Sequence, residues 1–243
     1  MTPPSERRAA AVVTGASSGV GRALALRFAS TVQRLVLLGR DTARLRAVAR
    51  EVEQRGAEAS YHVAHFDSAL EVDQLARELE GLPAVSALLH AAGEFASEPI
   101  ASGPVSDLDR LLAVNLRAPY VLTRALLGAL ERGNGDVVFI NSSVVGQQRA
   151  GASVYSASKA GLVAVADSLR QECNPLGLRV LSVFLGATAT PMQEQIHARA
   201  ARPYRPEVLL QTTDVAEIIY AALALPRGAE VTDLYLRAVF QGV

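Results

Sequence analysis

The sequence predicts an α/β fold in which helices cover both faces of a mostly parallel, doubly wound sheet of seven strands. Short apolar runs alternate with longer segments of helical spacing along the 243 residues. This order requires crossover connections between strands, and such connections make a sheet parallel and bury both of its faces. We expect a single domain over residues 1–243, because no linker, repeat or low-complexity stretch divides the chain.

The expected strands are short runs rich in valine, leucine or isoleucine, which suits strands buried on both faces. They cover residues 10–14, 34–38, 60–65, 85–90, 136–141, 178–184 and 230–236. The segments between them place apolar residues on one side of a helix. These helical segments cover residues 20–30, 42–55, 70–79, 108–131, 155–173 and 214–225.

Helix ends have their own sequence signals. Gly56, Gly133 and Gly177 stand where three of the helices are expected to stop. Ser106 followed by Asp109 resembles a capping box with a shortened acid, so a helix is expected to begin there. The least regular segment, residues 191–212, is expected to form a substrate-binding flap and not a domain boundary.

Charge and composition exclude several classes of function. Lys+Arg and Asp+Glu are both 24, so no basic excess exists to neutralise nucleic acid or an anionic membrane. No apolar run approaches the ~20 residues of a membrane span, and residues 9–13 are too short for a signal-peptide core. We therefore expect a cytoplasmic protein with neither nucleic acid nor membrane as partner. A single cysteine, Cys173, and four scattered histidines predict no disulfide and no metal site.

A glycine-rich loop follows the first strand and opens the first helix. In an open parallel sheet, ligands bind beyond the carboxyl ends of the strands, and the free N–H groups at a helix start attract a pyrophosphate. The position of this loop therefore indicates a dinucleotide site, although an ordinary glycine turn is the alternative. The residues expected to bind the dinucleotide here are Gly15, Ser17, Ser18, Gly19, Val20 and Gly21.

The end of the second strand indicates which dinucleotide binds. Gly39 stands where an acid would hold the adenosine ribose hydroxyls, and Arg40 follows it. A guanidinium pairs with a 2′-phosphate, so NADP(H) is preferred over NAD(H), unless Arg40 is an ordinary surface arginine. Asp67, after the third strand, is expected to accept a hydrogen bond from the adenine amino group, or else to cap the next turn.

Lys159 is the only lysine among the 24 basic side chains. Chance is one explanation for the single lysine. The other is a role that needs a compact, titratable ammonium and that a planar, permanently charged guanidinium cannot fill. Tyr155 precedes Lys159 by one helical turn and shares its face of the helix. A phenol has a pKa near 10, so nearby positive charge is needed before it can shuttle protons at neutral pH. The alternative is a structural pair with a half-buried tyrosine.

Ser142 ends the fifth strand, 13 residues before Tyr155, and with it the chain resembles the short-chain dehydrogenase/reductase family. The glycine loop, Asn115, Ser142, Tyr155 and Lys159 follow one another in the family's order, and the resemblance spans nearly the full length. It implies a Rossmann-type fold, a nicotinamide cofactor, and hydride transfer coupled to proton transfer. It also implies a homodimer or homotetramer, with the helices of Asn115 and Tyr155 at the interface.

The resemblance assigns a role to each catalytic candidate. Tyr155 is the general acid in reduction and the general base in oxidation, and Ser142 hydrogen-bonds the substrate oxygen. Lys159 binds the nicotinamide ribose and lowers the tyrosine pKa, while Asn115 helps to hold a water in a proton relay. Ser143 competes for the role of Ser142, but the spacing to Tyr155 favours Ser142. For Asn115 the alternative is a polar helix residue without chemistry.

Two stretches depart from the family's pattern. His90 and Ala91 replace the usual pair of asparagines, so His90 is expected to be structural. Leu185 replaces the usual proline before Gly186, in the loop that is expected to bind the carboxamide. The further cofactor-binding candidates from these two loops are Ala91, Ala92, Gly93, Gly186, Thr188 and Thr190.

Together these features predict an NADP(H)-dependent oxidoreductase that interconverts a ketone or aldehyde and an alcohol. Two alternatives remain open: an epimerase or dehydratase on the same fold, and a sensor or scaffold that binds NADP(H) without turnover. The presence of Ser142, Tyr155 and Lys159 favours chemistry over the scaffold. Residues expected to face a small carbonyl or alcohol substrate are Glu94, Phe95, Val144, Gln147, Gln148, Ala187, Met192, Ile196 and Tyr204.

Overall fold

A computed structural model describes residues 9–239, so residues 1–8 and 240–243 of the expected domain lie outside the described part. Seven parallel strands form one sheet in the order β3-β2-β1-β4-β5-β6-β7. The strands are β1 (Ala10–Thr14), β2 (Arg34–Gly39), β3 (Glu58–Val63), β4 (Val85–His90), β5 (Asp136–Ser142), β6 (Arg179–Leu185) and β7 (Asp233–Leu236). The strand order reverses between β1 and β4, and such a switch point opens a crevice at the carboxyl ends of the strands.

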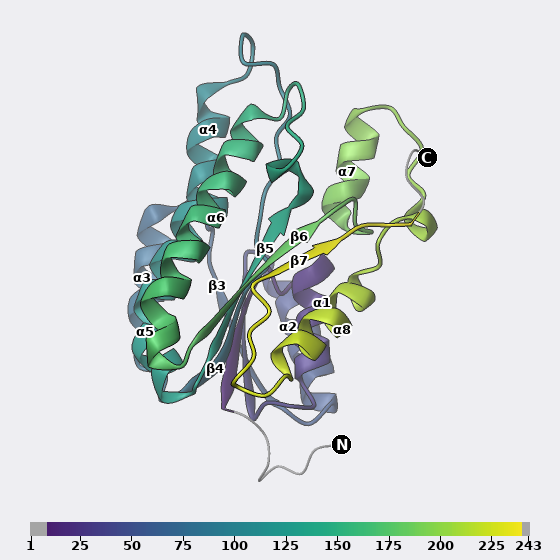
Figure 1. Ribbon diagram of the computed structural model, residues 1–243. Helices are drawn as coiled ribbons and strands as arrows, with labels where there is room; N and C mark the ends of the chain where they lie inside the picture. Colours follow the sequence, from purple (N-terminus) through teal and green to yellow (C-terminus); the bar gives the residue numbers. More distant parts are fainter. Residues whose placement is uncertain (1–8, 240–243) are drawn as a thin grey trace.

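Helices cover both faces of the sheet, which confirms the predicted doubly wound, Rossmann-type fold (Figure 1). They are α1 (Gly19–Phe28), α2 (Thr42–Gln54), α3 (Ala69–Leu79), α4 (Val105–Leu112), α5 (Ala118–Arg132), α6 (Ser153–Cys173), α7 (Pro191–Arg199) and α8 (Thr212–Leu223). Helices α1, α2 and α8 lie on one face, and α3, α5 and α6 on the other. None of the helices in the described part is long and apolar enough to cross a membrane.

The strands are apolar at consecutive positions because each face of the sheet has its own core. Along β1, Val13 packs into the core under α1, α2 and α8, whereas its neighbour Val12 packs into the core under α3, α5 and α6. Leu37 and Leu38 of β2 divide between the two cores in the same way. Successive side chains of a strand point to opposite faces, so both faces must be apolar where both are covered.

Several element boundaries differ from the sequence expectation. The segment expected as one helix over residues 108–131 contains α4, a π-helical turn at Ala113–Arg117, and α5. The expected capping box at Ser106 is wrong, because α4 begins at Val105 directly after the extended backbone of Pro104. Gly56 and Gly177 adopt positive φ angles of 93° and 82° just after helical turns, as expected of residues that stop a helix.

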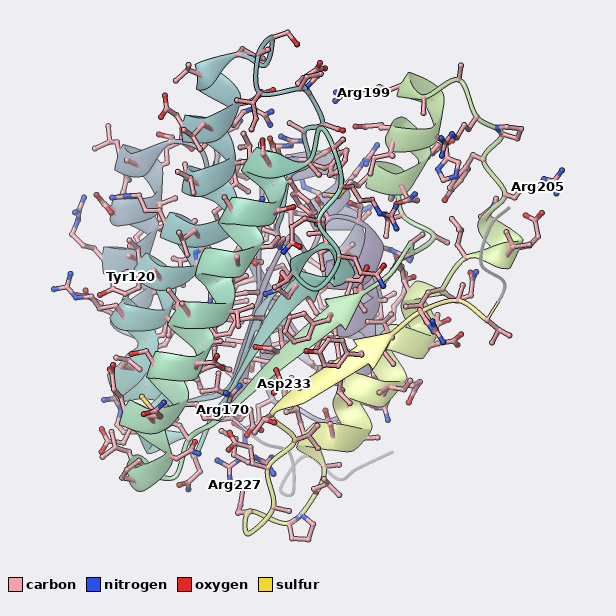
Figure 2. All side chains as sticks on the ribbon, turned by 45° about the horizontal axis from the view of Figure 1, so that its top comes forward. Tyr120, Arg170, Arg199, Arg205, Arg227 and Asp233 are labelled. Carbon is pink, nitrogen blue, oxygen red and sulfur yellow. The ribbon has the colours of Figure 1, made fainter. Side chains whose placement is uncertain are left out.

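An ion cluster closes the amino end of the sheet. Asp136 of β5 is fully buried, and its carboxylate accepts hydrogen bonds from Arg179 Nε at 2.9 Å and Arg227 Nη1 at 2.5 Å. Arg179 also donates to the backbone carbonyls of Leu223 and Leu225. Figure 2 shows Arg227 at the end of the molecule remote from α7. The cluster therefore fixes the base of the sheet and leaves the carboxyl ends of the strands free for a site.

Candidate active site

The glycine loop after β1 packs against the loop after β4. Gly15 has a φ of +67°, and a Cβ atom on it would lie 2.8 Å from the Cα of Ala92. A Cβ on Gly21 would overlap the carbonyl oxygen of Gly15. At both positions the neighbouring backbone leaves no room for a side chain. Glycine is therefore required there by contact and not merely favoured by the conformation of a turn. The two loops are therefore in direct backbone contact at the carboxyl ends of β1 and β4.

The first turn of α1 is open to an anion. Ser18 occupies the N-cap position with an extended backbone, and among the described residues its side chain makes no capping hydrogen bond. The first turn, from Gly19 to Arg22, contains no acidic residue. The uncapped N–H groups carry the positive end of the helix dipole, so they can bind a phosphate. Ser17 lies beside the end of β2, where its Oγ would be 3.5 Å from a Cβ on Gly39.

Thr14 holds the loop after β4 in place. Its Oγ1 accepts hydrogen bonds from the N–H groups of Ala91 at 3.1 Å and Ala92 at 3.0 Å. Sequence reasoning did not assign this role, although Thr14 directly precedes Gly15. A Cβ atom on Gly93 would lie 3.6 Å from Lys159 Nζ. The structure therefore brings the glycine loop, Ala91 to Gly93, and Lys159 together at one end of the sheet.

Tyr155 and Ser142 meet at the junction of β5 and α6. Burial raises the pKa of the Tyr155 phenol, and hydrogen bonding with Ser142 opposes that rise. Ser142 is half-buried and ends β5, whereas Ser143 is exposed. The ring of Phe95 packs edge-on against Tyr155 at a centroid distance of 5.0 Å. The two hydroxyls and the aromatic wall form a compact site next to the loop after β4.

Lys159 is buried beneath the loop after β4, and its Nζ donates to the carbonyl of Ile140 at 2.9 Å. Burial lowers its pKa to about 8. The buried side chain of Asn141 ties Lys159 to β5, because its Nδ2 donates to the Lys159 carbonyl at 3.2 Å. Its Oδ1 accepts from the Ser142 N–H at 2.8 Å. Sequence reasoning missed Asn141, and its position one residue before Ser142 was the available signal.

Asn115 lies in the π turn and is fully buried. Its Oδ1 accepts from the N–H of Glu94 at 2.9 Å, and its Nδ2 donates to the carbonyl of Glu94 at 2.9 Å and to Ser158 Oγ at 3.0 Å. Ser158 in turn donates to the carbonyl of Tyr155 at 2.8 Å. The amide thus joins the loop after β4 to the first turns of α6, and the water relay stays a prediction.

The loop after β6 closes the site from the side of α7. Thr188 is buried, and its Oγ1 donates to the carbonyl of Gly186 at 2.9 Å. Thr190 caps α7 by accepting from the N–H of Gln193 at 3.2 Å. A Cβ atom on Gly19 would lie 3.2 Å from Thr190 Cγ2, so the two loops face each other across a narrow gap. Figure 1 shows α7 beyond the carboxyl ends of the strands.

The candidates for adenosine recognition lie at the ends of β2 and β3. Arg40 is exposed, and its guanidinium forms a 2.7 Å ion pair with Glu94. Glu94 also pairs with Arg110, so its carboxylate, which was expected to face the substrate, is directed at two arginines. Asp67 is exposed, and the capping hydrogen bond at the start of α3 goes to Ser68 and not to Asp67.

Sequence and structure comparisons with known proteins agree on one protein family. The sequence profile described as short chain dehydrogenase matches residues 9–201. An uncharacterized oxidoreductase of Staphylococcus saprophyticus is 30% identical over 94% of this chain and 97% of its own length. The alcohol dehydrogenase of the archaeon Thermococcus sibiricus, solved with 5-hydroxy-NADP, superimposes with a TM-score of 0.85 at 27% identity, covering 96% of this chain and 98% of that one.

A metagenomic short-chain oxidoreductase solved with NADP has a TM-score of 0.82 at 28% identity, over 98% of this chain and all of its own. The match of the profile over most of the chain agrees with the motifs and with the sheet order. The chain therefore belongs to the short-chain dehydrogenase family of oxidoreductases.

Proposed function

We propose that the protein is an NADP(H)-dependent oxidoreductase that interconverts a ketone or aldehyde and an alcohol, with Tyr155 as the proton donor and acceptor. The observation that carries this proposal is the meeting of Tyr155 with Ser142, next to Lys159 and the glycine loop. A proton-transferring phenol, a second hydroxyl and an ammonium thus lie beside a crevice suited to a dinucleotide.

The residues present fit a dinucleotide. The backbone of Gly15 packs so closely on Ala92 that no side chain fits there, and the open first turn of α1 follows at the carboxyl end of β1. Gly15 to Gly21 would hold the pyrophosphate through backbone N–H groups. Ala91 to Gly93 would contact the cofactor through backbone atoms, and Thr188 and Thr190 would hold the carboxamide. When bound, the reduced dinucleotide supplies a hydride to the carbonyl carbon.

Ser142 and Tyr155 would both hydrogen-bond the carbonyl oxygen of the substrate, and Tyr155 would give it a proton during reduction. In oxidation Tyr155 would take that proton back. Burial raises the phenol pKa, so efficient transfer at neutral pH needs a counteracting charge. Lowering a pKa by about 3 units takes on the order of 4 kcal/mol, which the buried Lys159 ammonium and the charge of an oxidised nicotinamide would contribute together.

Arg40 would select NADP(H) by pairing with the 2′-phosphate. Two of the superimposed structures were solved with NADP or a derivative of it, which supports the choice. Replacement of Arg40 by aspartate puts a negative charge near the 2′-phosphate, so the ratio of kcat/KM with NADPH to that with NADH should fall by at least about tenfold, or 1.4 kcal/mol. An unchanged ratio would remove Arg40 from the cofactor site.

The oxidation of NADPH over a panel of ketones and aldehydes tests the proposal, with Tyr155→Phe as the paired variant. Tyr155→Phe keeps the ring contact with Phe95 and removes only the hydroxyl. Turnover should fall by about 10²-fold or more, the usual contribution of a positioned proton donor. Wild-type turnover in this variant would refute the role of Tyr155. Cofactor binding without turnover of any substrate would favour the sensor or scaffold.

Residues 1–243 are proposed to act as one domain, with residues 191–212 as a flap over the substrate. Helix α7 within this segment has no buried residue and follows the capping residue Thr190 directly. A cytoplasmic location stays a prediction.

We also propose a homodimer or homotetramer, as in the family. An apolar groove of about 520 Å³ lies between the π turn and α6, and Leu116, Tyr120, Gly161 and Val165 are among the residues that line it. Figure 2 shows Tyr120 on the outer side of the helical layer. Two such faces packed together would bury this groove.

A further inference from the structure

The ion pair between Arg40 and Glu94 spans the cofactor crevice. Arg40 directly follows β2, and Glu94 lies in the loop after β4. These two strands are not neighbours, because β1 lies between them in the sheet. The 2.7 Å contact therefore crosses the carboxyl end of β1, where the glycine loop begins at Gly15. A dinucleotide that enters the crevice meets this ion pair.

Glu94 is the fixed partner and Arg40 is the movable one. The backbone N–H and carbonyl of Glu94 are both bonded to Asn115, and its carboxylate is shared with Arg110. Arg110 is held in turn by Asp107 at 2.7 Å. The Glu94 side chain is 19% exposed, whereas that of Arg40 is 69% exposed. When Arg40 turns away, the Glu94 carboxylate keeps a positive partner, so opening the pair leaves no buried charge alone.

We propose that Glu94 is a specificity-determining residue that competes with the 2′-phosphate of the cofactor for Arg40. This inference rests on the proposed NADP(H) specificity of Arg40. The Glu94 carboxylate occupies Nη1 of Arg40, so the 2′-phosphate gains the full fork of donors only after Glu94 has released the guanidinium. A nucleotide without the 2′-phosphate offers Arg40 no new anion and leaves it with Glu94. Glu94 therefore weakens binding of NADP(H) selectively and moderates the preference over NAD(H).

The test measures binding of 2′,5′-ADP and 5′-AMP by calorimetry, because these two probes differ only in the 2′-phosphate and need no turnover. Four forms of the full-length protein are compared: wild type, Glu94→Gln, Arg40→Gln and the double variant. An exposed ion pair is worth up to about 1 kcal/mol, so Glu94→Gln should tighten 2′,5′-ADP binding by about three- to fivefold. Binding of 5′-AMP should change by less than about 1.5-fold, since it does not compete for Arg40.

Asp107→Asn is the matched control. It removes one negative charge from the same cluster, but Asp107 pairs with Arg110 and not with Arg40. Its effect on 2′,5′-ADP binding should stay below about 1.5-fold, because only long-range, screened charge is lost. An equal gain in Asp107→Asn and Glu94→Gln would mean that general repulsion, and not competition for Arg40, limits binding, and it would overturn the inference.

The Arg40→Gln variant and the double variant together separate this inference from the proposed function. If Arg40→Gln leaves 2′,5′-ADP binding unchanged, Arg40 does not bind the 2′-phosphate, and the cofactor assignment fails together with the inference. If Arg40→Gln weakens binding but Glu94→Gln tightens it equally with and without Arg40, only the competition is refuted. Should Glu94→Gln fail to fold, Glu94→Asp keeps the charge and shortens the reach to Arg40. It should likewise tighten 2′,5′-ADP binding, and an unchanged or weaker affinity would refute the competition.

Discussion

The burial of His90 should make the stability of the protein sensitive to acid. It is buried at the end of β4, its Nε2 lies 2.8 Å from Thr123 Oγ1, and its ring stacks on Phe139 at 5.0 Å. The other ring nitrogen, Nδ1, is buried without a hydrogen-bond partner among the described residues. Burial therefore lowers the pKa of His90 from 6.5 to about 3, and the imidazole stays neutral in the folded protein.

The sign and size of the effect follow from this pKa. Between pH 6.5 and about 3 the unfolded chain binds a proton at His90 that the folded protein does not, so stability falls as the pH falls. From about pH 7 to about pH 5 the free energy of unfolding should drop by about 2 kcal/mol through this residue alone. His90→Asn removes the titrating group and keeps a polar side chain at that position, where the family usually has asparagine.

Urea unfolding of the wild type and His90→Asn at about pH 7 and about pH 5 measures the difference. The variant starts from a lower stability because it loses the stacking on Phe139, so only the change with pH is compared. The wild type should lose about 2 kcal/mol more than the variant over this interval. Equal losses in the two proteins would show that His90 titrates alike in the folded and unfolded states, which would contradict its burial as a neutral group.

Three further outcomes are expected. Lys159→Arg should lower kcat on the order of a hundredfold, because the larger fork misplaces the charge in a buried space, and near-native activity would refute the lysine-specific role. Asp136→Asn should lower the free energy of unfolding, measured in urea, by about 3–5 kcal/mol, because it leaves the buried Arg179 without its carboxylate partner. Arg227→Gln should lower it by about 1 kcal/mol or less, and equal losses in the two variants would contradict this reasoning. Tyr120→Glu should reduce the molar mass measured by light scattering, and an unchanged mass would exclude that face as the interface.

The fold could be predicted because strong periodic signals carried it. Both faces of the sheet are covered, so each strand is an apolar run, and Gly56 and Gly177 mark helix ends through their positive φ angles. The π turn at Ala113–Arg117 was missed, because one extra residue in a turn hardly changes the helical pattern over a long segment. The start of α4 was misplaced because Ser106 resembled an N-cap, whereas the helix begins one residue earlier, directly after Pro104.

The candidate site could be predicted in part. Residues within one motif, such as Tyr155 and Lys159, were found because a helix fixes their separation. Partners far apart in the chain were not found. Asn141 and Thr14 stand beside Ser142 and Gly15 in the sequence, but that position does not show which backbone groups of other elements they bond. The pairing of Arg40 with Glu94, 54 residues later, depends on which strands flank β1, so it became visible only with the sheet order.

The Asp136 cluster also has a consequence for protein synthesis. Arg227 follows Asp136 by 91 residues, and the carbonyls of Leu223 and Leu225 that saturate Arg179 are also made late. A ribosome adds about 5–20 residues per second, so the central strands wait several seconds for these partners. During that interval a nascent chain exposes an unfinished sheet edge, which is open to pairing with other chains.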